Sequence, residues 1–172
     1  KRNPKRVAFA DADNFNVLKA AQIVREDGIA EPILLGDTKV IQKLNSDNNL
    51  GLDNVEIINP HSSAATKIRK EYAEILYQKR QRKGINRDEA EDLIHNPNYF
   101  GVMMVETGDA DAFISGYSSK YADTIRPAIQ VIGIQPGVHY IAGMYITMTE
   151  KGPFFFADTT VNVEPSPEAL VD

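Results

Sequence analysis

The stretch from Val7 to Gly36 reads VAFADADNFNVLKAAQIVREDGIAEPILLG, and it decides the fold class. Short apolar runs open and close it, at 7–10 and 32–36. Between them the apolar residues follow helical spacing over 15–27, and Gly28 is a typical helix stop. The stretch therefore predicts a strand, a helix and a second, fully buried strand, which is the repeating unit of a parallel sheet.

The alternation of strands and helices continues beyond this stretch. The expected elements are a helix at 38–44, a polar loop at 45–49, a strand at 55–58, helices at 64–83, 86–94 and 99–107, a strand at 112–114 and a helix carrying Arg126. After Gly137 the pattern changes to two strands, 139–149 and 154–163, joined by a turn at 150–153. This predicts an α/β fold, a three-layer α/β/α arrangement around a mostly parallel sheet in residues 1–137, with the beginning of a second subdomain, rich in antiparallel strands, in residues 138–172.

Composition excludes several classes of site and partner. The net charge is −5 and the pI is about 5.2, so we expect no nucleic-acid partner and no attraction to an anionic membrane. Cysteine is absent, which excludes disulfides, thiolate metal sites and a cysteine thioester. No apolar run reaches the length of about 18 residues that a spanning helix needs, and the expected location is cytoplasmic.

A candidate anion site follows the strand at 112–114. Ser115 and Gly116 form a turn without bulky side chains, and such a turn before a helix leaves backbone N–H groups and the positive helix end available to phosphate. Thr124 adds a hydroxyl, and Arg126 offers a planar fork for phosphate or carboxylate. An ordinary serine-capped helix start, with Arg126 in solvent, explains the same pattern and stays open.

Other candidates carry alternatives of the same kind. The ends of parallel strands share one edge of a sheet, which should bring Asp11–Asn14, Gly36–Asp37 and the serine turn together. Arg80, at the end of the 64–83 helix, either stabilises the helix dipole or holds a phosphate. Asp109 and Asp111 could hold a metal or form a turn, and Asp158 could meet a ligand or form a hydrogen-bonded corner. The three histidines have no metal-ligand spacing, so we assign no metal ligand and no catalytic residue.

Several motifs resemble the phosphate acetyltransferase/butyryltransferase family over essentially the whole chain. They are Tyr99-Phe100-Gly101, Gly108-Asp109-Ala110-Asp111, Ser115-Gly116, Ala122-Asp123-Thr124-Ile125-Arg126-Pro127-Ala128 and Phe155-Phe156-Ala157-Asp158-Thr159-Thr160-Val161-Asn162. The resemblance implies a phosphotransacetylase/isocitrate dehydrogenase-like fold of two subdomains, with a cleft for coenzyme A and acetyl phosphate. Arg80 and Arg126 fall where family members have phosphate-holding arginines, and Ser115-Gly116 falls in the cleft motif.

Within that family, 141–145 and 152–162 resemble the C-terminal domain of bacterial NADP-dependent malic enzymes. The reading that follows is a regulatory domain that binds acetyl-CoA or a similar effector through Arg80, Ser115, Gly116, Thr124 and Arg126. Its parent would oxidatively decarboxylate malate, with NADP and Mg or Mn in upstream malic enzyme domains, as a homo-oligomer. The chain itself would need no cofactor.

Two departures from the family bear on activity. Tyr117 is bulky where the family has a small residue, and no histidine follows it. The family's serine and aspartate that are thought to act on the thiol are expected beyond Asp172, so the chain alone would lack a complete transferase site. The alternatives are a fragment of a genuine phosphate acetyltransferase and a non-catalytic oligomerisation module.

Overall fold

The computed structural model describes residues 3–158, 160–162, 164 and 166–167, and its internal contacts divide the chain into two units between Ile132 and Gly133. Each unit is described by itself. None of the helices in these residues is long and apolar enough to cross a membrane.

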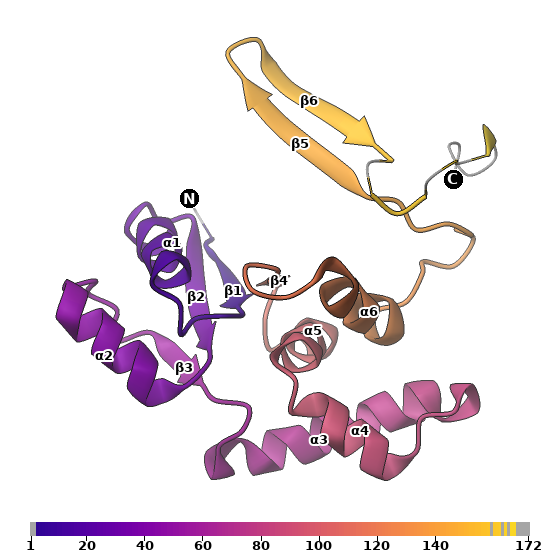
Figure 1. Cartoon of the computed structure of the whole chain (residues 1–172), viewed down its shortest axis with the longest axis horizontal. Helices are drawn as coiled ribbons and strands as arrows, with labels where there is room; N and C mark the ends of the chain where they lie inside the picture. The colour runs from indigo at the N-terminus through magenta and orange to yellow at the C-terminus, as the bar shows by residue number, and fades with distance from the viewer. Residues whose placement is uncertain (1–2, 159, 163, 165, 168–172) are drawn as a thin grey trace. The chain divides into compact units, whose positions relative to one another are not determined.

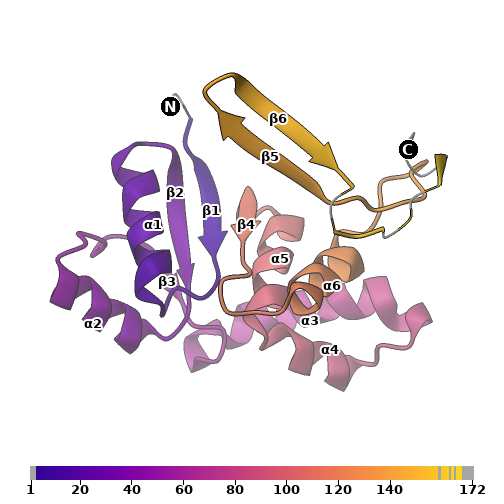
Figure 2. The ribbon, with the colours of Figure 1, turned by 45° about the horizontal axis from the view of Figure 1, so that its top comes forward.

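The first unit is built on a four-stranded parallel sheet in the order β3-β2-β1-β4, as the alternating pattern predicts. Its strands are β1 (Lys5–Phe9), β2 (Ala30–Leu35), β3 (Glu56–Ile58) and β4 (Ala112–Ile114). Strand β1 lies inside the sheet, between β2 and β4 (Figure 2). The loops after β1, β2 and β4 therefore leave the sheet at the same edge.

Helices cover both faces of this sheet, which confirms the three-layer α/β/α prediction (Figure 1). The helices are α1 (Phe15–Glu26), α2 (Thr38–Asn48), α3 (Thr66–Arg80), α4 (Arg87–Ile94), α5 (Pro97–Thr107) and α6 (Tyr121–Val131), with short 3-10 turns η1 (Ser63–Ala65) and η2 (Gln81–Lys83). Val7 and Phe9 pack into one hydrophobic core with α1 and α2. Ala8, between them in sequence, joins the other core with α3, α4 and α5. Alternate side chains of β1 thus serve opposite layers.

Helix α5 is the central helix of its layer, because the seven consecutive residues 98–104 are all buried. Gly101 allows this helix to lie close to β4. A Cβ atom built at Gly101 would come within 2.2 Å of the Phe113 ring. A side chain of any size at residue 101 would therefore displace the helix or the ring.

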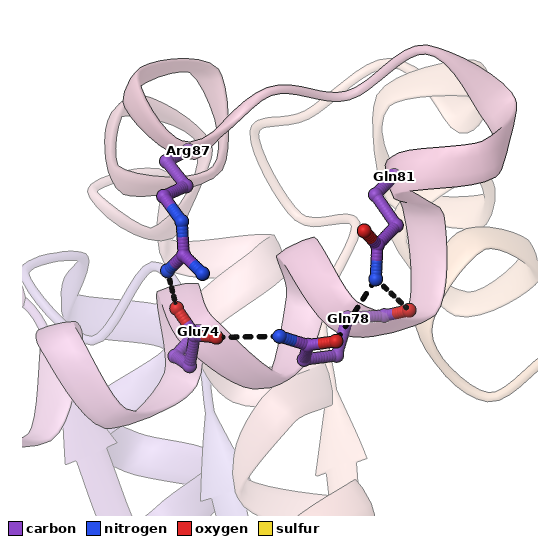
Figure 3. Close-up of polar contacts among 4 residues, drawn as sticks. All are labelled: Glu74, Gln78, Gln81 and Arg87. Atoms are coloured by element: carbon purple, nitrogen blue, oxygen red, sulfur yellow. Dashed lines mark hydrogen bonds and ion pairs between the residues drawn. The ribbon is translucent and has the colours of Figure 1, made fainter.

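A surface network ties the end of α3 to the start of α4 (Figure 3). The guanidinium of Arg87 pairs with the Glu74 carboxylate and lies 4.3 Å from the centre of the Tyr77 ring. Gln78 donates to the other oxygen of Glu74 at 2.7 Å, and Gln81 donates to Gln78 at 2.9 Å. The contacts of Arg87 hold the start of α4 against α3 across the turn that Gly84 forms, and the two glutamines extend the network along α3.

The boundaries differ from the sequence prediction where long-range contacts decide them. Helix α2 runs through most of the expected loop 45–49, because the Asn45 amide is buried and bonds to Asp53 and to the backbone N–H of Leu52. Helix α5 begins at Pro97 and not at 99, since Asn96 caps it.

The second unit contains an antiparallel hairpin, as predicted. Its strands are β5 (Met144–Thr149) and β6 (Gly152–Ala157), with Thr149 opposite Gly152. The hairpin is shorter than the expected 139–149 and 154–163, and the end of the second expected strand, Val163, lies outside the described residues, as does Thr159. After β6 the chain turns at Asp158, whose carboxylate accepts backbone N–H groups of Gly143, Val161 and Asn162.

Candidate functional site

The turn after β4 brings together three of the predicted site residues. Gly116 has φ +103°, a conformation that residues with a Cβ rarely adopt. A Cβ placed there would lie 3.9 Å from the Thr124 hydroxyl oxygen, so the turn and the first turn of α6 are in close proximity. Ser115 precedes this bend and joins it to β4. The predicted Ser115, Gly116 and Thr124 therefore form one local cluster.

The hydroxyls of this cluster donate to the protein itself. Ser115 Oγ donates to Asn98 Oδ1 at 2.5 Å, and Ser118 Oγ donates to Asp11 Oδ1 at 2.5 Å. Thr124 Oγ1 donates to the Lys120 carbonyl at 3.4 Å. The sequence suggested these hydroxyls as donors to a ligand. In the structure these three hydroxyls donate to the protein, so the groups left to meet an anion are backbone N–H groups, the arginines and the Ser119 hydroxyl, which accepts from Asn98.

Arg80 and Arg126 lie near the same tyrosine on α5. Burial raises the pKa of the Tyr99 phenol, and the positive charges of Arg126 and Arg80 oppose that shift. Arg126 is exposed, and within the described residues it makes no ion pair. Arg80 is partly buried, and its Nε is a buried donor without a hydrogen-bond partner in the described part of the chain. A buried N–H of this kind is normally satisfied, so an acceptor from outside the chain would fit it.

The first turn of α5 links these two groups of residues. Asn98 holds the Ser115 turn, and the next residue, Tyr99, lies within electrostatic reach of both arginines. No hydrogen bond joins either arginine to the turn among the described residues. The site thus consists of a serine-glycine turn after β4 and two arginines, Arg80 from α3 and Arg126 from α6, all near the first turn of α5.

The predicted convergence of loops at the sheet edge is confirmed. Asp11, Asp13, Gly36 and Asp37 line one hollow of about 270 Å³ beyond β1 and β2. The bond from Ser118 to Asp11 connects the turn after β4 to the same edge. Three carboxylates make this hollow unfavourable for phosphate, which favours the arginine side.

Ser115 also lines an apolar slot of about 200 Å³, with Phe9, Val17, Ile114 and Tyr117 in its walls. Tyr117 accepts a hydrogen bond from Asn16 at 2.6 Å, which fixes its ring across the slot. The bulky residue that departs from the family pattern is thus held by α1.

The remaining candidates have structural roles. Asp109 accepts from the hydroxyls of Thr107 and Tyr72, both at 2.6 Å, and these bonds lower the pKa of its carboxyl. Asp111 accepts the backbone N–H of Arg6 at 2.8 Å. No cluster of three acidic or histidine side chains suited to a metal occurs in the described residues.

Asp158 forms the hydrogen-bonded corner that the sequence left as one of two alternatives. Desolvation acts to raise the pKa of its carboxyl, but the backbone N–H groups of Gly143, Val161, Asn162 and Thr160 outweigh it and hold that pKa well below its usual range. Both oxygens of Asp158 are engaged by these groups.

Sequence reasoning missed Asn98 and Tyr99 as contributors to the site. Asn98 was expected in a loop that closes the preceding helix, although Asn96 followed by Pro97 is a typical helix start. That signal moves Asn98 into the first turn of α5, next to the apolar residues that point inward. Its partners, 17 to 25 residues further along, are visible only in the fold.

Comparison with known proteins identifies relatives over the full chain. The sequence profile described as "Phosphate acetyl/butaryl transferase" matches residues 1–172. The phosphate acetyltransferase of Helicobacter pylori strain J99 is 37% identical over 172 residues, which is 100% of this chain and 33% of that protein. The phosphate acetyltransferase of Clostridium acetobutylicum is 32% identical over 178 residues, covering 100% of this chain and 53% of its own length.

Among solved structures, the EutD phosphotransacetylase from Staphylococcus aureus superposes with a TM-score of 0.84 and 30% identity. The match covers 97% of this chain and 49% of that one. The chain therefore has the fold of these enzymes and spans about a third to a half of the length of the relatives described here.

These relatives correct the branch of the family that the sequence suggested. They are named phosphate acetyltransferases, and nothing among them points to a malic enzyme, so the prediction of a regulatory malic enzyme domain, an oxidoreductase using NADP, is wrong. The Mg or Mn expected for its parent depended on that reading. The described residues of the segments that suggested it, 141–145 and 152–162, include parts of the hairpin strands and the Asp158 corner, and they contain none of Arg80, Ser115, Gly116, Thr124 and Arg126.

Proposed function

The chain belongs to the phosphate acetyl/butyryl transferase family, and from that membership we propose that the protein transfers an acetyl group between coenzyme A and inorganic phosphate. This was the first alternative to the malic enzyme reading. Its substrates would be acetyl phosphate and coenzyme A in one direction, and acetyl-CoA and phosphate in the other.

The chemistry needs an anion site beside a thiol. The sulfur of coenzyme A attacks the acetyl carbonyl carbon of acetyl phosphate, a C–S bond forms, and the C–O bond to phosphate breaks. Phosphate leaves with the electron pair of the C–O bond, and the proton of the thiol ends on the departing phosphate as hydrogen phosphate. Positive groups that hold the phosphoryl oxygens stabilise the charge that grows on the leaving group.

We assign Arg80 and Arg126 to the phosphoryl group, with the backbone of Ser115 and Gly116 and the start of α6 at Thr124 beside them. The observation that carries the proposal is that the charges of Arg80 and Arg126 both act on Tyr99, and that the buried Nε of Arg80 has no hydrogen-bond partner among the described residues. These residues bind and neutralise charge. None of them is assigned to the thiol proton, and the reaction as written needs no further cofactor from this chain.

The test is formation of acetyl-CoA from acetyl phosphate and coenzyme A by the purified natural protein that contains residues 1–172. We expect saturable dependence on both substrates and phosphate release equal to thioester formation. Failure of the wild-type protein to form thioester would overturn the proposal.

We also propose that the protein is a homo-oligomer. The hairpin supports this, because seven of its apolar side chains are exposed, and water-exposed apolar groups of this extent favour association. They are Met144, Tyr145, Ile146, Met148, Phe154, Phe155 and Phe156. Sedimentation of the protein as a monomer at micromolar concentration would contradict this.

A further inference from the structure

Asn98 is a buried amide whose partners lie in the proposed anion turn and in the first turn of α6. The residue is 4% exposed, and the only other buried asparagine in the described residues is Asn45. Asn98 Oδ1 accepts from Ser115 Oγ at 2.5 Å. Its Nδ2 donates to Ser119 Oγ and to the Asp123 carbonyl, both at 3.3 Å. One amide therefore joins both ends of the turn to the first turn of α6.

The direction of these bonds follows from the Asp123 carbonyl. A carbonyl oxygen can only accept, so the amide nitrogen of Asn98 must face it and the amide oxygen must face Ser115. Because an amide oxygen is itself only an acceptor, Ser115 has to supply the hydrogen of their bond. The single hydroxyl proton of Ser115 thus points into the protein, and its lone pairs remain on the other side.

We propose that Asn98 is a positioning residue for the acetyl transfer. It holds the turn between Ser115 and Ser119 against α6 and keeps the Ser115 oxygen as a hydrogen-bond acceptor toward the substrates. The inference rests on the proposed function, since it assigns a task to a residue that supports that site.

In this arrangement the turn and the arginines contact different groups of the substrates. Phosphoryl oxygens accept hydrogen bonds, and the Ser115 oxygen has no hydrogen to offer them while Asn98 holds its proton. Rotating the hydroxyl outward would leave the buried Asn98 oxygen without a hydrogen-bond donor, which is unfavourable for a desolvated acceptor. The Ser115 oxygen can therefore accept a hydrogen bond from an N–H or O–H group of a substrate, such as an amide N–H of coenzyme A. The phosphoryl group is bound by Arg80 and Arg126.

The matched control is Asn45→Ala. Asn45 is also a buried asparagine, 7% exposed, but it bonds to Asp53 and Leu52 on the opposite face of the sheet. Both alanine variants lose a buried amide with its hydrogen bonds, so we expect similar losses of thermal stability. Only Asn98→Ala should change how the substrates are held.

The experiment is steady-state kinetics of acetyl-CoA formation by the purified protein, with melting temperatures for each variant. We expect Asn98→Ala to lower kcat/KM for coenzyme A by about tenfold or more, and Asn45→Ala to change it by less than about twofold. Equal kinetic losses in the two variants would overturn the positioning role. Wild-type protein without activity would instead overturn the proposed function, and the inference with it.

A double-mutant cycle shows whether Asn98 acts through Ser115. If it does, Asn98→Ala should lower kcat/KM much less in a Ser115→Ala background than in the wild type, and additive effects would contradict the mechanism.

Ser119→Ala is the test to use if Asn98→Ala fails to fold, because it removes a single contact at a half-buried residue. We expect this variant to fold and to raise the KM for coenzyme A about threefold, from loss of one of the hydrogen bonds that hold the turn. An unchanged KM would overturn the inference.

Discussion

Arg80 and Arg126 each carry a guanidinium group, but one is partly buried and the other is exposed. This difference in burial determines how each can contribute to ligand binding and to stability. Arg126 is exposed and unpaired within the described residues, so it is free to follow a substrate and contributes little to folding. Arg80 is partly buried, with its Nε already desolvated. A ligand oxygen that reaches Arg80 satisfies a donor that otherwise has no partner, which makes this contact the stronger of the two per bond.

Arg126→Ala should therefore impair binding without loss of stability. We expect the KM for acetyl phosphate to rise about tenfold or more, since a hydrogen bond to a charged group contributes about 1.5–3 kcal/mol. The melting temperature should stay within about 2 °C of the wild type, because a surface change of this kind alters stability little. Arg82→Ala, another exposed arginine at the end of the α3 region, is the control and should leave the KM within about twofold. Equal effects of the two variants would remove Arg126 from the site.

The hydrogen bonds of Asp109 lead us to expect that the free energy of unfolding decreases in acid. The hydroxyls of Thr107 and Tyr72 lower the pKa of Asp109 in the folded protein. The resulting stabilisation is present above the ordinary aspartate pKa of about 3.9 and is lost as pH falls through the lowered value. Urea unfolding between about pH 5 and pH 2 should show a smaller loss of unfolding free energy for Asp109→Asn than for the wild type. The exposed Asp47→Asn variant should parallel the wild type, and identical curves for all three proteins would refute the effect.

At the scale of elements, the helix–strand alternation was predictable because the central strands β1 and β2 have consecutive buried apolar residues and the intervening helices have apolar residues at helical spacing. The order of elements from β1 to α6 follows from these local patterns. The extent of α2 and the start of α5 do not follow from local patterns. The polar composition of these segments favours a loop, but the buried Asn45 and the cap at Asn96 stabilise helix instead. The same distinction holds for the site. Ser115, Gly116 and Thr124 are contiguous enough to be recognised together, whereas the contact of Asn98 with the turn exists only after α5 has packed on β4.

The packing of α5 on β4 leads to a prediction at Gly101. Alanine is normally about 1 kcal/mol better than glycine inside a helix, so Gly101→Ala would be stabilising if there were room. Because the added Cβ would come within 2.2 Å of the Phe113 ring, we expect a loss of about 1–3 kcal/mol in the free energy of unfolding. Chemical denaturation measures this. Phe113→Val should recover part of the loss in the double variant, and a Gly101→Ala protein as stable as the wild type would contradict the close approach.

For the whole molecule, the distribution of buried residues predicts that the first unit folds independently. Every buried hydrophobic residue in the described part of the chain lies between Val7 and Val131. The second unit adds a hairpin whose side chains are mostly exposed. A polypeptide of residues 1–132 should therefore unfold cooperatively, with a melting temperature within about 4 °C of that of residues 1–172, a shift of about 1 kcal/mol or less. An unfolded or non-cooperative product would show that the hairpin unit is needed for the fold.

The burial of α5 has a consequence for measuring the stability of this protein. Residues 98–104 are enclosed on all sides, so their backbone amides can meet solvent deuterons only when the first unit opens as a whole. Their exchange rates, followed by mass spectrometry under native conditions, report the free energy of that global opening without denaturant. Amides in the same helix would then serve as an internal reference against which faster exchange in the serine-glycine turn, and its slowing when substrate is added, can be read.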